Sequence, residues 1–220
     1  MKSFNSFHKI FYAFFIFIAA LLVFRFLYAG SLGYLFLGWN LFLAWIPYEL
    51  STFFSQYRHR QPWKQVMLFA SWLLFFPNAL YIVTDLVHLQ GESNMPWWYD
   101  AVLVFASSFM GIVLAFISLR KAELYLQGLV RPQQVNGLMA LILFLGSFGV
   151  YLGRFQRWNS WDVLNNPVGL ATDIISKVIN PLDHYKVWAI TILFTAVYSL
   201  IYYFIKLLPQ ALTEIKNTGS

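Results

Sequence analysis

Long apolar segments are the feature that most constrains this chain. Six of them lie near residues 10–29, 32–53, 65–88, 100–119, 137–153 and 187–207. An α-helix of about 20 apolar residues crosses the roughly 30 Å hydrocarbon core of a bilayer. Within that core the backbone polar groups must be paired inside the chain, which favours helices. The sequence therefore predicts an all-α polytopic membrane bundle with about six transmembrane helices.

The composition excludes a soluble protein. Of 220 residues, 60% are hydrophobic and 11% are charged, whereas soluble domains typically have about 25% charged residues. So few charges cannot cover a soluble surface, and residues 1–220 are expected to form a single integral membrane domain in contact with lipid. The net charge of +6 does not indicate nucleic-acid binding, because the Lys and Arg residues are scattered among the apolar segments.

The distribution of positive residues predicts the orientation in the membrane. Of the 15 Lys and Arg residues, ten fall on one side of the predicted spans and five on the other. Positive residues concentrate on the cytoplasmic side of membrane proteins. We therefore expect both termini in the cytoplasm, and the loop 89–99, which contains no Lys or Arg, outside.

The longest connection, residues 154–186, contains a further helical pattern. Its middle, VGLATDIISKVI (168–179), places apolar residues at helical intervals between Pro167 and Pro181. Such a pattern is typical of a short helix that lies on a membrane surface. We expect a short amphipathic surface helix in this last outer loop, and a lid over a polar site is the alternative.

A stripe of polar side chains marks the third predicted span. In FPNALYIVTDLVHL (76–89), Asn78, Tyr81, Asp85 and His88 follow one another at steps of three, four and three residues. On an α-helix these steps keep the four side chains on one face. His88 titrates near neutral pH and lies one turn from Asp85, which could orient it as a general base. These two residues are the catalytic candidates.

Two other stretches combine polar and aromatic residues, PWWYD (96–100) and GRFQRWNSWD (153–162). With the predicted orientation, both reach the same outer face as the stripe. Unpaired polar groups within a membrane cost several kcal/mol, which predicts that they surround a common cavity open to the extracytoplasmic side. The expected lining and rim residues are Arg25, Asn40, Asn78, Tyr81, Asp85, His88, Asp100, Arg154, Arg157, Asn159 and Asp162.

The residue types at this face suit an anionic, lipid-like ligand. Arg154 and Arg157 could hold one phosphate or carboxylate between them if the helix continues past residue 153. Aromatic rings could grip an acyl chain or a sugar. The candidate substrate-binding residues are Asn78, Tyr81, Trp98, Arg154, Arg157, Trp158 and Asn159.

A divalent metal is the one cofactor that the sequence suggests. Oxygen and imidazole ligands could come from Asp85, His88, Asp100 and Asp162. The chain has no cysteine and no recognised metal motif such as H-E-x-x-H, so this metal site is a candidate only.

A purely structural interpretation accounts for the same residues. Three arginines could neutralise three aspartates as buried pairs, and the tryptophans could belong to the interfacial aromatic belt. The asparagines could hydrogen-bond between helices. The residues of the three pairs would be Arg25, Arg154 and Arg157 with Asp85, Asp100 and Asp162.

The stretches FPNALYIVTDLVHL, PWWYD and RWNSWD, in a chain of this length, resemble the bacterial predicted membrane proteins of the domain of unknown function 1361 family. The resemblance covers nearly the whole chain. It implies a multi-pass protein of the bacterial inner membrane and supplies no reaction.

Three classes of function therefore stay open. The first is an intramembrane enzyme that opens to the outer face and acts on a lipid or lipid-linked anionic substrate. The second is a proton- or cation-coupled carrier, for which a homodimer would have to build the pathway, because no internal repeat is visible. The third is a non-catalytic membrane component, which could be a binding protein, an assembly partner or a sensor of an extracytoplasmic ligand.

Overall fold

The structure is a computed structural model that describes residues 2–54, 61–90 and 95–218, without the side chains of 2–8, 88, 90 and 216–218. Within these residues the chain is helical and contains no strand. It divides into two compact units, residues 1–122 and residues 123–220. Each unit is described by itself, so the prediction of a single domain stays a prediction.

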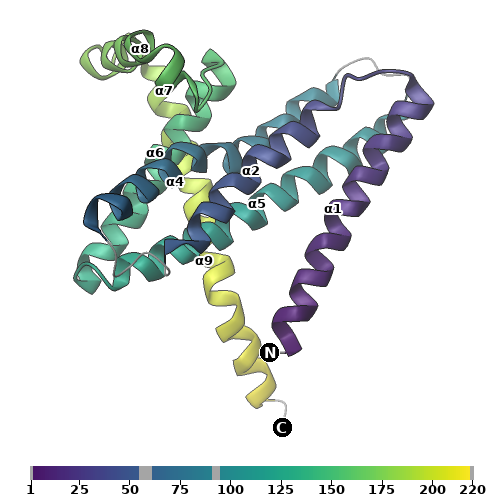
Figure 1. The fold of residues 1–220 in the computed structure, drawn as a ribbon, viewed down its shortest axis with the longest axis horizontal. Coiled ribbons are helices and arrows are strands. Elements are labelled where there is room, and N and C mark those ends of the chain that lie inside the picture. The colour runs from purple at the N-terminus through teal and green to yellow at the C-terminus, as the bar shows by residue number, and fades with distance from the viewer. Residues whose placement is uncertain (1, 55–60, 91–94, 219–220) are drawn as a thin grey trace. The chain divides into compact units, whose positions relative to one another are not determined.

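The described residues of unit 1 form α-helices and a 3-10 helix (Figure 1). Its elements are α1 (Lys2–Ala29), α2 (Phe36–Thr52), α4 (Pro62–Tyr81), η1 (Ile82–Gln90) and α5 (Trp97–Gln127). The last residues of α5, from Glu123 onward, group with unit 2. Within unit 1, α2 packs against α4, and both contact η1.

The described residues of unit 2 include two long helices joined by two shorter ones (Figure 1). Its elements are α6 (Pro132–Gln156), α7 (Asp162–Asn165), α8 (Pro167–Ile179) and α9 (Tyr185–Thr218). The two long helices, α6 and α9, pack against each other, and α7 contacts α8.

The long helices confirm the predicted all-α polytopic class. Five helical stretches in the described residues are long and apolar enough to cross a membrane: Lys9–Ala29, Pro62–Val87, Trp97–Gln127, Pro132–Gln156 and Tyr185–Ile215. The second predicted span, 32–53, corresponds to α2, which has only 17 residues. At a rise of 1.5 Å per residue, α2 extends for about 25 Å. Of the six predicted spans, it is the one that is not among these five helical stretches.

The third predicted span, 65–88, changes its winding at Ile82, where α4 gives way to the 3-10 helix η1. Helix α5 approaches closely at this junction: a Cβ atom on Gly111 would lie 2.0 Å from Ile82 Cγ2. Ser108 Oγ donates to Ile82 O at 3.0 Å. The carbonyl of Ile82 is therefore held from outside its own helix. A 3-10 helix has three residues per turn, so Asp85 no longer lies beneath Tyr81 as it would on an α-helix.

Helix α8 is amphipathic, as the sequence predicts, and it turns its apolar face outward. Val168, Ile175 and Ile179 are exposed. On the opposite face Asp173 is half-buried and Lys177 is only 1% exposed. An exposed apolar face together with a buried polar face suits a helix in contact with lipid rather than with water.

Candidate functional site

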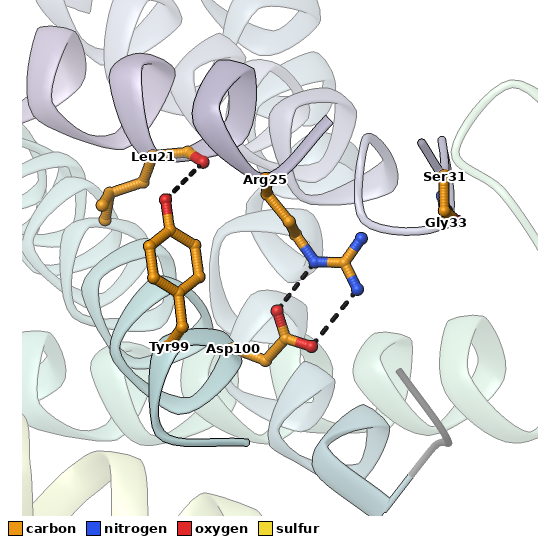
Figure 2. Close-up of polar contacts among 6 residues, drawn as sticks. All are labelled: Leu21, Arg25, Ser31, Gly33, Tyr99 and Asp100. Atoms are coloured by element: carbon orange, nitrogen blue, oxygen red, sulfur yellow. Dashed lines mark hydrogen bonds and ion pairs between the residues drawn. The ribbon is translucent and has the colours of Figure 1, made fainter. Parts of the chain in front are cut away.

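A buried ion pair joins the end of α1 to the start of α5. Arg25 Nε lies 2.7 Å from Asp100 Oδ1, and Arg25 Nη2 donates to Asp100 Oδ2 at 3.2 Å (Figure 2). Arg25 is 4% exposed and Asp100 is 3% exposed. A buried charge is tolerated when a well-placed opposite charge binds it. The contact is one of the pairs that the structural interpretation requires.

Two tyrosines surround this pair. The Arg25 guanidinium lies 3.8 Å from the centre of the Tyr34 ring, a cation–π contact. Tyr34 precedes α2, and its pKa is raised by burial and by the negative charge of Asp100, to which it hydrogen-bonds. Figure 2 shows the Tyr99 hydroxyl pointing to Leu21, where it donates to the carbonyl at 2.8 Å. The cluster thus connects α1, α5 and the segment between α1 and α2.

Asp85 is fully buried in η1 and is contacted from α2. Asn40 Nδ2 donates to Asp85 Oδ2 at 2.7 Å. Polar contact between two membrane helices is a recognised means of fixing their packing. The side chain of His88 lies outside the described residues. The catalytic role assigned to Asp85 and His88 therefore stays a prediction.

The other predicted ligand residues of unit 1 lie at different places on it. Asn78 Nδ2 donates to the Phe75 carbonyl within α4 at 3.1 Å. Tyr81 is half-buried at the end of α4. Trp98, in the first turn of α5, is 57% exposed, and its ring meets the Tyr99 ring edge to face. Trp98 thus contacts Tyr99, the tyrosine that precedes Asp100 in α5.

The remaining predicted ligands form one turn of unit 2, residues 154–162, which we call the arginine turn. Helix α6 continues past Gly153, as the prediction required, but ends at Gln156. Arg154 lies in its last turn, whereas Arg157 caps the helix with a left-handed φ of 61°. The two arginines therefore do not share a helical face. Arg157 is exposed.

Hydrogen bonds within and beyond the arginine turn fix its shape. Trp158 N–H donates to Leu152 O at 3.1 Å and so ties the turn back to the last turns of α6. Asp162 Oδ2 accepts the Asn159 backbone N–H at 2.7 Å. Trp158 Nε1 donates to Asp173 Oδ2 at 2.9 Å and so ties the turn to α8.

Asp173 and Lys177 were not singled out from the sequence. Lys177 Nζ forms an ion pair with Asp173 Oδ1 and donates to Asp173 O at 3.1 Å. An acid four residues before a lysine on a helix is the spacing that favours such a pair. The four-residue spacing of Asp173 and Lys177 within the predicted surface helix could have indicated this ion pair.

A second polar cluster that sequence reasoning missed lies at the other end of α5 and is built with α9. Glu123, 1% exposed, accepts from Tyr202 Oη and from Lys206 Nζ, each at 2.6 Å. Tyr202 and Lys206 are four residues apart and therefore share one face of α9. The four-residue spacing of Tyr202 and Lys206, together with an acidic residue close to a predicted span, could have indicated this cluster. We interpret the cluster as a structural pair between helices.

The predicted metal site is not assembled by the side chains that the structure describes. Among them, no three His, Cys, Asp or Glu residues lie close enough to hold an ion. Asp85 and Asp100 belong to unit 1 and Asp162 to unit 2, while the side chain of His88 lies outside the description. The four-residue metal site and the common polar cavity both stay predictions.

Comparison with known proteins gives one result. No curated protein and no solved structure matches the chain. A family model, described as "Protein of unknown function (DUF1361)", matches residues 39–201. This stretch is most of the chain and includes all three of the polar stretches that carry the resemblance. The chain is a membrane protein that belongs to the DUF1361 family.

Proposed function

We propose that this protein binds an anionic lipid, or a lipid-linked anionic molecule, at the arginine turn. We further propose that it lies in the bacterial inner membrane with both termini in the cytoplasm and the arginine turn outside. The two-to-one distribution of Lys and Arg supports this orientation.

The backbone of Arg157 is the observation that carries the binding proposal. Arg157 is the one described residue other than glycine with a positive φ. The left-handed conformation costs such a residue roughly 1–2 kcal/mol, and glycine commonly occupies this position at helix ends. Strain of this kind concentrates at functional sites. An exposed arginine in this conformation is explained if its guanidinium is needed for a ligand.

The surroundings of Arg157 favour a phosphate or carboxylate at the level of the lipid headgroups. The arginine turn follows a spanning helix directly. It contains two arginines and one aspartate, which sum to a formal charge of +1 (two minus one). Guanidinium groups match phosphate and carboxylate oxygens through pairs of N–H groups. Trp158 adds an amphipathic ring of the type that concentrates at membrane interfaces.

The contacts of Asp85 and Asp100 support binding rather than acid–base catalysis. Asp100 accepts from Arg25, and Asp85 accepts from Asn40. Both carboxylates thereby serve contacts between helices. A binding function needs neither of them to change protonation, whereas catalysis or proton-coupled transport through Asp85 would have to break its contact with α2.

The test is the affinity for defined lipids of the full chain purified in detergent. Native mass spectrometry would count adducts of phosphatidylglycerol, of a polyprenyl phosphate and of zwitterionic phosphatidylcholine. Arg157→Gly removes the guanidinium and relieves the backbone. We expect affinity for one of the two anionic lipids to fall about tenfold, which corresponds to about 1.4 kcal/mol.

The matched control is Lys186→Gln. Lys186 is exposed in the first turn of α9, on the same predicted side of the membrane, and its replacement removes the same charge. This control should retain anionic lipid binding. The lipid that Arg157→Gly loses would distinguish a phospholipid from a lipid-linked phosphate. Equal adducts in wild type and Arg157→Gly, or equal binding of phosphatidylcholine, would overturn the proposal.

A further inference from the structure

A hollow with a volume of about 280 Å³ lies in unit 1 between the end of α2 and the first turns of α4. The described residues that line it are Phe53, Trp63, Lys64, Met67 and Leu68. Four of these five side chains are apolar, and one is a lysine. The four residues of α4 follow a helical spacing and form one continuous stripe along its start.

The hollow opens outward from the chain. Trp63 and Met67 are both more than half exposed, and Lys64 is exposed as well. Because Pro62–Val87 is long and apolar enough to cross a membrane, we place its first two turns where hydrocarbon meets the headgroups. The exposed apolar lining therefore faces lipid chains rather than water.

The charge at the rim of the hollow is positive. The Lys64 ammonium lies 5.3 Å from the Trp63 ring centre. The first turn of α4 contains no acidic residue, and the amino end of a helix carries a partial positive charge. Both contributions attract an anion to the headgroup end of an apolar hollow.

We propose that this hollow binds an anionic phospholipid of the leaflet that faces Lys64, predicted to be the cytoplasmic leaflet. One acyl chain lies against Phe53, Met67 and Leu68, while the phosphate lies at Lys64 and the start of α4. Lysine near a membrane surface attracts anionic lipid, and Trp63 provides an interfacial ring beside it. This site is separate in sequence and in charge pattern from the arginine turn, so neither proposal depends on the other.

Two substitutions test the two halves of the site. Lys64→Glu reverses the charge at the rim, and Met67→Trp fills the apolar hollow with a larger side chain. Val66→Trp is the matched control, because Val66 is at least as exposed on α4 as Met67 but is not among the residues that line the hollow. Phosphatidylglycerol adducts would be counted by native mass spectrometry of the detergent-purified chain, with phosphatidylcholine as the zwitterionic comparison.

We expect Lys64→Glu and Met67→Trp each to lower phosphatidylglycerol affinity at one site by at least tenfold, and Val66→Trp to leave it unchanged. Arg157→Gly should leave this adduct in place. Unchanged binding in both test variants would overturn the proposal, as would equal affinity for phosphatidylcholine. A dimer seen in wild type and lost in Met67→Trp, without a change in lipid binding, would assign the hollow to a second copy of the chain.

Discussion

The buried polar residues of unit 1 and the arginine turn of unit 2 contain similar side chains in opposite settings. In unit 1, Arg25 and Asp100 are buried and bind each other through two hydrogen bonds. In the arginine turn, Arg157 is exposed, and its backbone is held in a left-handed conformation. The first arrangement gives each buried charge a partner within the fold. The second costs stability and leaves a cation at the surface.

This difference separates the two explanations that the sequence left open. The structural interpretation accounts well for Arg25, which neutralises an aspartate within its own unit. It accounts poorly for Arg157, because an exposed and strained arginine contributes little to folding. A polar residue in a membrane protein therefore indicates function when its conformation or its environment lowers the stability of the fold.

Arg25→Gln should give the largest effect among the changes that probe this comparison. It leaves the Asp100 carboxylate buried without its cation, which costs about 3–5 kcal/mol. The loss would be measured as a lower midpoint of unfolding in detergent, followed by circular dichroism. Lipid affinity at the arginine turn should not change in whatever protein remains folded.

The control for this prediction is the double variant Arg25→Gln with Asp100→Asn, which removes both charges together. It should recover most of the lost stability, because no buried charge is left without a partner. If Arg25→Gln is as stable as wild type but loses anionic lipid, then the ion pair is a binding site and the comparison is wrong.

Asn40→Ala and Asn78→Ala form a matched pair with a smaller effect. Asn40 donates to a buried carboxylate on another element, whereas Asn78 donates to a carbonyl of its own helix. A hydrogen bond to a charged group contributes about 1.5–3 kcal/mol, and polar contacts in membranes average about 0.6 kcal/mol. Asn40→Ala should therefore lower unfolding stability by about 2 kcal/mol and Asn78→Ala by less than about 1 kcal/mol. Equal losses would show that the two amides play the same part.

Much of the fold could be predicted because long apolar runs identify most membrane helices. The five long spans follow from their apolar runs, and the amphipathic α8 follows from its periodicity. The change from α4 to η1 could not be predicted in this way. It coincides with contacts of Gly111 and Ser108, which lie more than 25 residues away in the sequence. Periodicity within one segment carries no information about such contacts.

The candidate site was less predictable because spacing gives the residues on a face but not their partners. The sequence indicated three arginines and three aspartates, yet only contacts between helices reveal that Arg25 binds Asp100. The buried Glu123 with Tyr202 was missed because the two residues are 79 positions apart. The left-handed backbone of Arg157 was also unexpected, since glycine rather than arginine is the usual signal for it.

Trp158→Phe tests whether the arginine turn is held in place by α8. The change keeps an aromatic ring and removes the N–H that donates to Asp173. One such bond contributes about 1 kcal/mol, so unfolding stability should fall by about that amount. Hydrogen exchange of the backbone in residues 157–162 should become faster, whereas exchange in α1 should not change. An unchanged exchange rate in the turn would show that Asn159 and Asp162 alone determine its shape.

Arg157→Gly should give the smallest effect and the opposite sign. Glycine relieves about 1–2 kcal/mol of left-handed strain but adds about 0.4–1 kcal/mol of chain entropy to the unfolded state, so a gain of about 0.5–1 kcal/mol is expected.

Arg157→Ala is the control, because it removes the same charge and keeps the strain. If the glycine variant is more stable to unfolding than both wild type and the alanine variant, the gain comes from the relieved backbone strain and not from the loss of charge. The chain then carries an arginine at a position where glycine would fold better, as a ligand-binding role requires. A glycine variant less stable than wild type would mean that the Arg157 side chain stabilises the turn, and the contrast with Arg25 would disappear.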